Sequence, residues 1–239
     1  MWPIPPRGSI MEGSRPSHRA TGASWASALG FWDRVEMRII AGQRRGHKIE
    51  GPKGSAATRP TSDLVRESLF NMVGALMPGR IAVDLFAGTG AIGLEALSRG
   101  AESAVFIETN RESVALIHAN VAKLRYQDRS RIRMADAYRW ARSHEPDPDQ
   151  PMAVFLDPPY REYQIHRKKI RAMLDALVER LPVESLIALE AGRVLDDRLL
   201  PDFEAWDIRR YGDTRIALWT KSDAAEPEPE PDAGAAEDA

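Results

Sequence analysis

Residues 81–93 of the 239-residue chain read Ile81-Ala82-Val83-Asp84-Leu85-Phe86-Ala87-Gly88-Thr89-Gly90-Ala91-Ile92-Gly93. The apolar run at the start is typical of a buried strand, and the glycines that follow fit the pattern G-x-G-x-x-G. Glycine lets a backbone turn tightly and approach a ligand closely, because it has no Cβ. The segment therefore predicts a strand, a ligand-binding loop and a helix, which is the opening unit of a doubly wound α/β sheet.

This loop alone does not identify its ligand, since NAD, FAD and S-adenosylmethionine are all bound in this way. Three acids at successive strand ends favour S-adenosylmethionine: Asp84 suits a cationic amino-acid moiety, Glu108 the ribose hydroxyls and Asp136 the adenine amine. Asp84 would repel a pyrophosphate. The predicted cofactor-binding residues are Asp84, Phe86, Gly88, Gly90, Glu108 and Asp136.

Strands and helices alternate along the rest of the chain, which favours a mostly parallel sheet. The predicted strands cover residues 81–85, 103–108, 131–134, 152–156 and 186–189. Residues 203–210 and 215–220, around Gly212-Asp213, predict an antiparallel pair at the end. The expected fold is therefore α/β and Rossmann-like, with an antiparallel C-terminal hairpin.

The tetrapeptide Asp157-Pro158-Pro159-Tyr160 directly follows a predicted buried strand. Neither proline can donate a ladder hydrogen bond, so the strand must stop there. A carboxylate and outward-facing carbonyls can accept both hydrogens of a planar amino group, while the tyrosine ring stacks on the attached heterocycle. We therefore predict that these four residues form a catalytic turn for an exocyclic amine of a nucleobase.

Composition limits the other possibilities. There are no cysteines, which fits a reducing cytoplasm and excludes cysteine–zinc sites, and the five histidines lack metal-ligand spacing. No apolar run is long enough to span a membrane. We expect a cytoplasmic protein without a metal.

The net charge of −2 conceals a basic body. Residues 223–239 hold seven acids and no base, so residues 1–222 carry +5. We expect four regions: a disordered extension over 1–36, a basic arm or hairpin over 37–58, the catalytic domain over 59–222, and a disordered acidic tail over 223–239.

Two basic clusters are candidates for binding phosphate. The predicted RNA-binding residues lie in or just after the arm, which we expect to be extended: Arg38, Arg44, Arg45, Lys48 and Arg59. A second cluster follows the catalytic turn, and for it a solvated helix face is an equally good interpretation: Arg161, Arg167, Lys168, Lys169 and Arg171.

Residues 37–220 resemble the bacterial 16S rRNA guanine-N(2) methyltransferases of the RsmD type. The similarity rests on the motifs above and on four further segments: Arg38-Ile39-Ile40-Ala41-Gly42, Arg59-Pro60-Thr61-Ser62-Asp63, Val65-Arg66-Glu67-Ser68-Leu69-Phe70-Asn71 and Tyr211-Gly212-Asp213-Thr214. The resemblance implies a class I methyltransferase sheet of strand order 3-2-1-4-5-7-6. It also implies S-adenosylmethionine as methyl donor and one guanine of 16S rRNA as acceptor, within an assembled small-subunit particle.

Other functions remain open on the residues alone. An adenine-amine DNA methyltransferase can share both core motifs, although this chain has little room for a target-reading domain. An RNA-binding module with a degenerate cofactor site is a second alternative, against which the intact Gly88, Gly90, Glu108 and Asp157 argue. A dinucleotide oxidoreductase is a third, and the catalytic turn has no role there.

Overall fold

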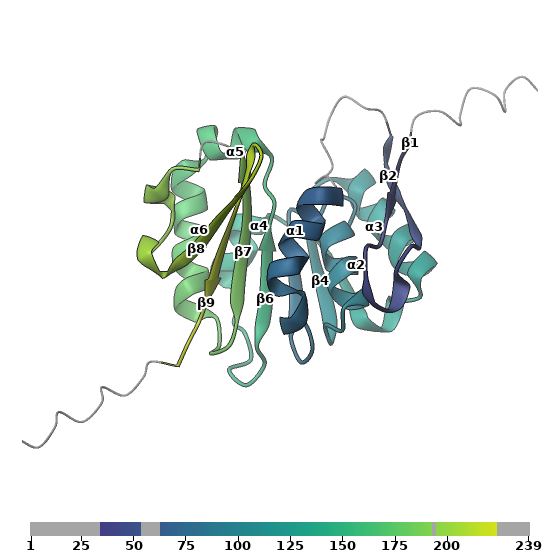
Figure 1. Ribbon diagram of the computed structural model, residues 1–239, viewed down its shortest axis with the longest axis horizontal. Helices are drawn as coiled ribbons and strands as arrows, with labels where there is room; N and C mark the ends of the chain where they lie inside the picture. The colour runs from purple at the N-terminus through teal and green to yellow at the C-terminus, as the bar shows by residue number, and fades with distance from the viewer. Residues whose placement is uncertain (1–33, 54–62, 193–194, 224–239) are drawn as a thin grey trace, which may run out of the picture. The chain divides into compact units, whose positions relative to one another are not determined.

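The computed structural model describes residues 34–53, 63–192 and 195–223 of the chain. Its centre is a seven-stranded sheet of order β5-β4-β3-β6-β7-β9-β8 (Figure 1). The strands are β3 (Ile81–Leu85), β4 (Ser103–Glu108), β5 (Ser130–Met134), β6 (Met152–Leu156), β7 (Leu186–Gly192), β8 (Trp206–Tyr211) and β9 (Thr214–Thr220).

The predicted topology is confirmed. Strands β3 to β7 run parallel, β9 pairs antiparallel with β7, and β8 pairs antiparallel with β9. When the seven strands of this sheet are numbered 1 to 7 along the chain, their order across the sheet is 3-2-1-4-5-7-6. Strands β3 and β6 are neighbours at the point where the strand order reverses. The glycine loop after β3 therefore lies beside the catalytic turn after β6.

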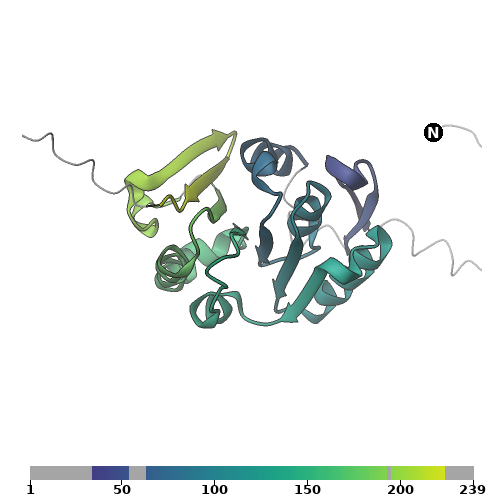
Figure 2. The ribbon, with the colours of Figure 1, turned by 90° about the horizontal axis from the view of Figure 1, so that it is seen from below.

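Helices cover both faces of the sheet (Figure 2). They are α1 (Asp63–Val73), α2 (Ala91–Ser98), α3 (Arg111–Leu124), α4 (Ala137–Ser143), α5 (Tyr160–Ile165) and α6 (Arg167–Arg180). Single 3-10 turns lie at η2 (Gly42–Arg44), η3 (Gly74–Leu76), η4 (Gln127–Arg129), η5 (Asp197–Leu199) and η6 (Phe203–Ala205). One apolar cluster packs α1, α2 and α3 on the sheet, and a second packs α4, α5 and α6 on the other face.

The amphipathic spacing predicted these helices well. In α6 the buried residues Ile170, Met173, Leu174 and Leu177 follow the helical period. The Asn110 side chain accepts the N–H groups of Glu112 and Ser113 at 2.9 and 3.0 Å and so caps α3.

Three details differ from prediction. β7 continues to Gly192 because β9 pairs with it along its whole length. α5 begins directly at Tyr160, where a turn was expected, because Pro159 accepts the Glu162 N–H at 2.7 Å and starts a helix. Leu64 is an apolar residue of α1 and would be expected to pack on the sheet, yet it is 69% exposed.

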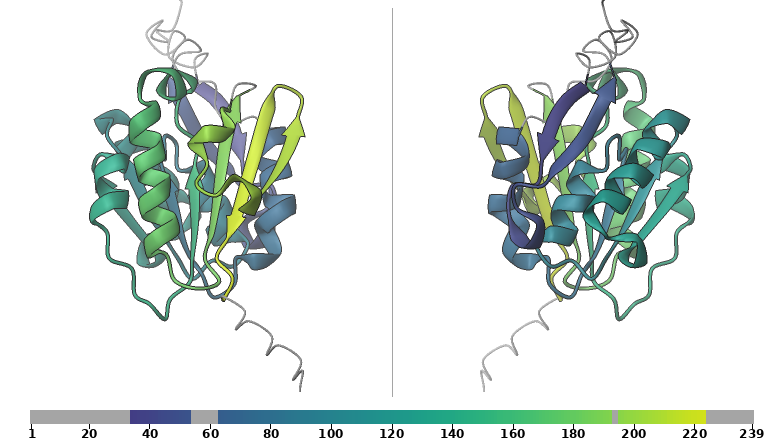
Figure 3. Two further views of the ribbon diagram at one scale, coloured as in Figure 1. Left: turned by 90° about the vertical axis from the view of Figure 1, so that its left-hand side faces the viewer. Right: turned by 90° about the vertical axis from the view of Figure 1, so that its right-hand side faces the viewer.

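The N-terminal arm is a two-stranded antiparallel hairpin, β1 (Arg34–Arg38) with β2 (Lys48–Lys53). Strand β1 begins at Arg34, three residues before the predicted start of the fold, because pairing with β2 supplies its hydrogen bonds without an apolar pattern. Figure 3 shows the hairpin alongside α2 and α3. The arm is therefore part of the catalytic unit.

Buried polar side chains hold this hairpin. The Glu95 carboxylate on α2 accepts the N–H groups of Ile40 and Ala41 at 2.7 and 3.0 Å. Ser98 Oγ donates to Ala41 O at 2.5 Å and accepts the Arg44 N–H at 2.9 Å. The expectation of an extended arm carrying Arg44 and Arg45 is wrong, because this segment is a turn bound to the last residue of α2.

Other predictions concern residues outside the described ranges. Arg59, the extension up to residue 33 and residues 224–239 of the acidic tail all lie there. Their predicted roles stay predictions.

Candidate active site

The carboxyl ends of β3, β4 and β6 meet at one edge of the sheet (Figure 1). Leu85 is level with Ile107 on β4 and with Leu156 on β6. The next residues along the chain are therefore the glycine loop, Glu108 and Asp157, which come together from three segments far apart in sequence. This edge holds the predicted site.

The loop between β3 and α2 has a backbone that suits close approach of a ligand. Phe86 has φ +66°, Gly88 +54° and Gly90 +78°. The positive φ of Phe86 is unfavourable for an L-residue and is a feature that clusters at functional sites. A Cβ added at Gly88 would meet only Phe86 O, at 3.9 Å, so this glycine faces open space. The loop therefore has room for a bound cofactor against its backbone.

Asp84 lies beneath this loop. Its carboxylate is 2% exposed and accepts the Gly93 N–H at 2.9 Å, which ties β3 to the first turn of α2. Burial raises the pKa of the Asp84 carboxyl well above its ordinary value; the Gly93 N–H opposes this shift, and the nearby negative charges of Asp157 and Glu108 add to it. A cation placed here would stabilise the ionised form.

Glu108 also supports the loop. Its Oε2 accepts the Gly88 N–H at 2.8 Å, and its Oε1 accepts the N–H groups of Thr109 and Asn110 at 2.7 and 2.8 Å. The Thr109 hydroxyl also lies 3.4 Å from Oε1, the longest of these contacts, and an ionised carboxylate has about four acceptor positions, so a ribose hydroxyl would replace this hydroxyl. Asp136 is exposed and caps α4 through the Arg139 N–H at 2.8 Å.

The catalytic turn follows β6 at the same edge. Asp157 is half-buried, and its charge acts on both Asp84 and Tyr163. Pro159 O accepts the Glu162 N–H of α5, whereas no turn or loop N–H of the described residues donates to Pro158 O. Asp157 and the Pro158 carbonyl are thus the acceptors that the turn offers to an amino group.

Tyr160 begins α5 and is 48% exposed. Its ring lies against the end of β7, because a Cβ added at Gly192 would be 3.3 Å from the Tyr160 ring. Tyr163 O–H donates to Glu190 O at 2.5 Å and anchors α5 on the same strand. The ring that we expect to stack on a base is therefore held at the edge while one face stays accessible.

Several supporting residues were missed in the sequence. Tyr138 packs edge-on against Phe86, with centroids 5.4 Å apart, and its hydroxyl donates to Glu162 at 2.8 Å. Tyr138 therefore links the glycine loop to α5. No spacing rule would have found it, because Tyr138 and Glu162 come from separate helices.

Glu95 and Asn120 are fully buried polar residues on helices that pack against the hairpin. A signal for them exists in the sequence: each is a polar residue on an otherwise apolar helical face. Buried polar groups of this kind require partners, and here the partners are backbone atoms of the hairpin.

The basic residues fall into two groups. Arg38 and Lys48 are exposed and directly opposite one another on β1 and β2. Arg44 lies over the Tyr126 ring, 5.6 Å from its centroid, at the amino edge of the sheet beside Ser98. Arg45 is exposed in the same turn. The structure thus separates Arg44 and Arg45 from the catalytic edge.

The cluster after the catalytic turn is partly neutralised. Arg167 pairs with Asp196, Arg171 pairs with Asp175 at 2.8 Å, and the Lys169 ammonium lies over the Tyr138 ring. Within the described ranges, Arg161 and Lys168 are both exposed and take part in none of these pairs. These two are the remaining candidates of that cluster.

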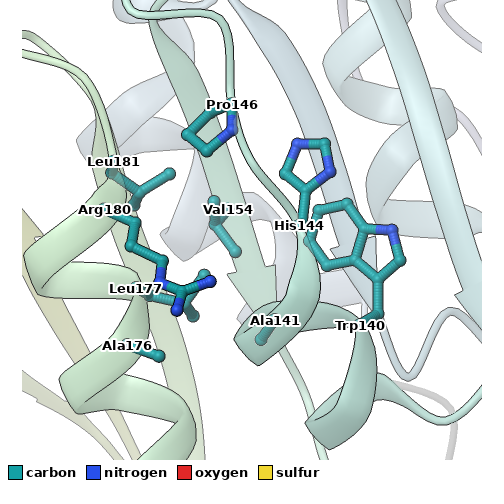
Figure 4. Close-up of a pocket in the computed structure, with 9 residues that line it drawn as sticks. All are labelled: Trp140, Ala141, His144, Pro146, Val154, Ala176, Leu177, Arg180 and Leu181. Atoms are coloured by element: carbon teal, nitrogen blue, oxygen red, sulfur yellow. The ribbon is translucent and has the colours of Figure 1, made fainter.

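A separate small pocket lies between α4 and α6 (Figure 4). It is lined by Trp140, Ala141, His144, Pro146, Val154, Ala176, Leu177, Arg180 and Leu181. Its volume of about 10 Å³ is roughly that of one water, and it lies near the C-terminal ends of both helices, away from the catalytic edge. It cannot hold a nucleoside.

In the described part of the chain, no group of three or more His, Asp or Glu side chains is placed so that it could hold a metal ion. No helix within these residues has the length and apolar character needed to cross a bilayer.

Comparison with known proteins matches residues 37–220 to the family described as Conserved hypothetical protein 95. Ribosomal RNA small subunit methyltransferase D of Escherichia coli K12 is 36% identical over 179 residues, which are 73% of this chain and 83% of that protein. The Bacillus subtilis protein YlbH is 32% identical over 188 residues, covering 77% of this chain and 99% of its own. The chain belongs to this family of RsmD-type methyltransferases.

Solved structures agree with this membership in the family. The Escherichia coli protein yhhF superimposes with a TM-score of 0.62 at 29% identity, covering 79% of this chain and 99% of the other. A Thermus thermophilus protein gives 0.60 at 26% identity, covering 77% and 99%. The fold is the class I methyltransferase fold.

Proposed function

We propose that this enzyme transfers a methyl group from S-adenosylmethionine to the 2-amino group of one guanine in 16S rRNA. The observation that carries this proposal is the position of the Asp157-Pro158-Pro159-Tyr160 turn beside the glycine loop, at one edge of the sheet. Relatives that are named small-subunit rRNA methyltransferases and cover most of this chain support the choice of RNA.

The residues of the glycine loop fit the proposed cofactor. Asp84 and Glu108 supply negative charge and acceptors, and Gly88 faces open space. When bound, S-adenosylmethionine supplies an electrophilic methyl group on a sulfonium. Asp84 would favour its cationic amino-acid portion, Glu108 its ribose and Asp136 its adenine.

The catalytic turn acts on the acceptor. The lone pair of the guanine 2-amino group is conjugated into the ring, so this amine is a poor nucleophile. Asp157 and Pro158 O accept its two hydrogens, which makes the nitrogen more tetrahedral and directs its lone pair outward. Tyr160 stacks on the base, a contact worth about 1–3 kcal/mol. Positioning is the main catalytic effect.

A base held in this way must be unpaired or turned out of its helix. The exposed Arg38 and Lys48 offer two cations to the flanking phosphates. Arg38 also lies 3.8 Å from the Asp63 carboxylate, and exposed ion pairs of this kind contribute little to stability, so its guanidinium can still contact a phosphate. We therefore keep these two residues as the RNA contact of the hairpin and set Arg44 and Arg45 aside.

The proposal is tested by tritium transfer from labelled S-adenosylmethionine to four acceptors. These are naked 16S rRNA, small-subunit particles that lack the modification, the same particles already modified, and duplex DNA. We expect label on unmodified particles or on 16S rRNA, and none on DNA. Transfer to DNA alone would identify the adenine-amine DNA methyltransferase instead, and binding of the cofactor without transfer to any acceptor would also contradict the proposal.

A further inference from the structure

The Asn120 side chain lies between the N-terminal hairpin and the glycine loop. It comes from α3 and is completely buried. Its Oδ1 accepts the Glu50 N–H at 2.7 Å, and its Nδ2 donates to Glu50 O and to Thr89 O, both at 3.0 Å. One amide thus joins β2, α3 and the loop between Gly88 and Gly90.

A second contact joins the same two segments. Thr89 Oγ1 lies 3.9 Å from Met37 Sδ on β1. The other side of the loop is packed by α3 as well, since a Cβ added at Gly90 would meet Ile117 at 3.3 Å. The cofactor loop therefore has the hairpin and α3 behind it, and its open side faces the catalytic edge.

Glu50, the hairpin residue that is bound to Asn120, is close to Arg38 and Lys48 on the outer face of the hairpin. Glu50 is two residues from Lys48 on β2, a separation of about 7 Å along a strand. Lys48 is opposite Arg38, whose side chain is 70% exposed. A phosphate held by this pair would restrain the same strand that Asn120 connects to Thr89.

We propose that Asn120 is a positioning residue that couples the RNA-binding hairpin to the cofactor loop. Each ligand orders part of one hydrogen-bonded unit, so binding of either favours binding of the other by the same factor. The coupling rests on the proposed function, since it requires RNA on the hairpin. The positioning of the loop by Asn120 does not, because it concerns the cofactor alone.

Asn120→Ala removes the donor to Thr89 O and both side-chain hydrogen bonds to the partly buried backbone N–H and O of Glu50. We expect about tenfold weaker binding of S-adenosylhomocysteine, the unreactive product, in the absence of RNA. The control is His118→Ala, which changes an exposed residue of the same helix and should bind like wild type. Circular dichroism identifies misfolding, and Asn120→Ser replaces the alanine variant if that one does not fold.

Asn120→Asp separates hydrogen bonding from packing. Its carboxylate would face two carbonyl oxygens and weaken binding at pH 8. Protonation on acidification restores a donor, so the deficit relative to wild type should shrink toward pH 5.5. A loss caused only by altered packing would not recover with pH, and a constant deficit would overturn the hydrogen-bonding role.

The coupling is measured by titrating S-adenosylhomocysteine with and without a saturating concentration of 16S rRNA, and again with unmodified small-subunit particles as the source of RNA. We expect RNA to tighten binding about fivefold or more in wild type and His118→Ala, and hardly at all in the folded Asn120 variant. Equal affinities with and without RNA in wild type, or an unchanged ratio in the variant, would overturn the coupling. If wild type binds neither 16S rRNA nor the unmodified particles, the proposed function fails, while the cofactor-only titration still decides whether Asn120 positions the loop.

Discussion

At the scale of single residues, two carboxylates at the same edge have different surroundings. Asp84 is buried and bound to the Gly93 N–H, so its ionised form lacks solvent. Asp157 is half-buried at the start of the catalytic turn. Their separate environments fit a division in which Asp84 supports the cofactor and Asp157 holds the acceptor.

Asp157→Ala should reduce methyl transfer by about 100-fold or more, because the amine would lose the group that orients it. Affinity for S-adenosylmethionine should stay within about threefold of wild type, since the loop and Glu108 are untouched. Calorimetry and tritium transfer on one preparation measure both quantities. Near-normal turnover would remove Asp157 from the mechanism.

Asp84→Asn should raise the melting temperature at pH 8, because asparagine can still accept the Gly93 N–H but carries no charge. The raised pKa of Asp84 means that the folded state binds its proton more tightly than the unfolded chain, whose carboxyl has a pKa of about 3.9. Wild type therefore loses stability as pH rises through the folded-state pKa of this group.

The thermal advantage of Asp84→Asn should accordingly shrink as pH falls toward 4. Melting curves of both proteins across this range test it. The same substitution should weaken S-adenosylmethionine binding, because it removes the charge that we assign to the cofactor. A difference in melting temperature that does not depend on pH would contradict the assignment of the shift to Asp84.

At the scale of elements, the hairpin is held in place by a close approach at its tip. A Cβ added at Gly42 would lie 1.9 Å from Ser98 O, whereas one added at Gly46 meets nothing within 4 Å. Both glycines have φ +79°. Alanine at either position has the same unfavourable φ, but only alanine at Gly42 would also displace the hairpin from α2. Comparing the two substitutions therefore isolates the second effect.

Gly42→Ala should lower the free energy of unfolding by at least about 1 kcal/mol more than Gly46→Ala. The clash is with backbone oxygen, which cannot move without shifting the end of α2. Urea denaturation of the two variants gives this difference directly. Equal destabilisation would show that the contact between the hairpin tip and α2 adds nothing to stability.

The outer face of the hairpin carries a prediction for RNA. Arg38→Ala with Lys48→Ala should weaken RNA binding and reduce the slope of log affinity against log salt by about 1.4 to 1.8, as expected for two phosphate contacts. Arg45→Ala is the matched control, because Arg45 is equally exposed but lies in the turn beside Ser98. If Arg45→Ala weakened RNA binding more than the double substitution did, the RNA would lie at the amino edge of the sheet instead.

At the scale of the whole molecule, the sheet was predictable because its strands are short apolar runs bounded by turn residues. Residues 81–85, 103–108 and 152–156 became strands with the expected bounds. The docking of the hairpin was not predictable, because it depends on Glu95 and Asn120, which meet residues 54 to 70 positions away. Local patterns predict elements, while contacts between elements need the fold.

The site follows the same division. The glycine loop and the Asp157-Pro158-Pro159-Tyr160 turn could be proposed from the sequence, since each is a contiguous motif at a strand end, and their roles stay predictions. Tyr138, Gly192 and Asn120 could not be proposed in this way, because each acts on a segment brought to it by the fold. The β1–β2 hairpin begins at Arg34, before the predicted start of the arm or hairpin at residue 37, and the expectation of an extended segment carrying Arg44 and Arg45 was wrong.

The identity of the methylated nucleoside is the most direct test of the proposed methyl transfer to guanine. After transfer to 16S rRNA or unmodified small-subunit particles, the RNA is digested to nucleosides and these are separated with mass detection. We predict N2-methylguanosine at one position per RNA molecule, and we predict that Asp157→Ala yields none of this nucleoside. N6-methyladenosine, or a ring-nitrogen or carbon methylation, would contradict the claim that the Asp157-Pro158-Pro159-Tyr160 turn holds the 2-amino group of a guanine.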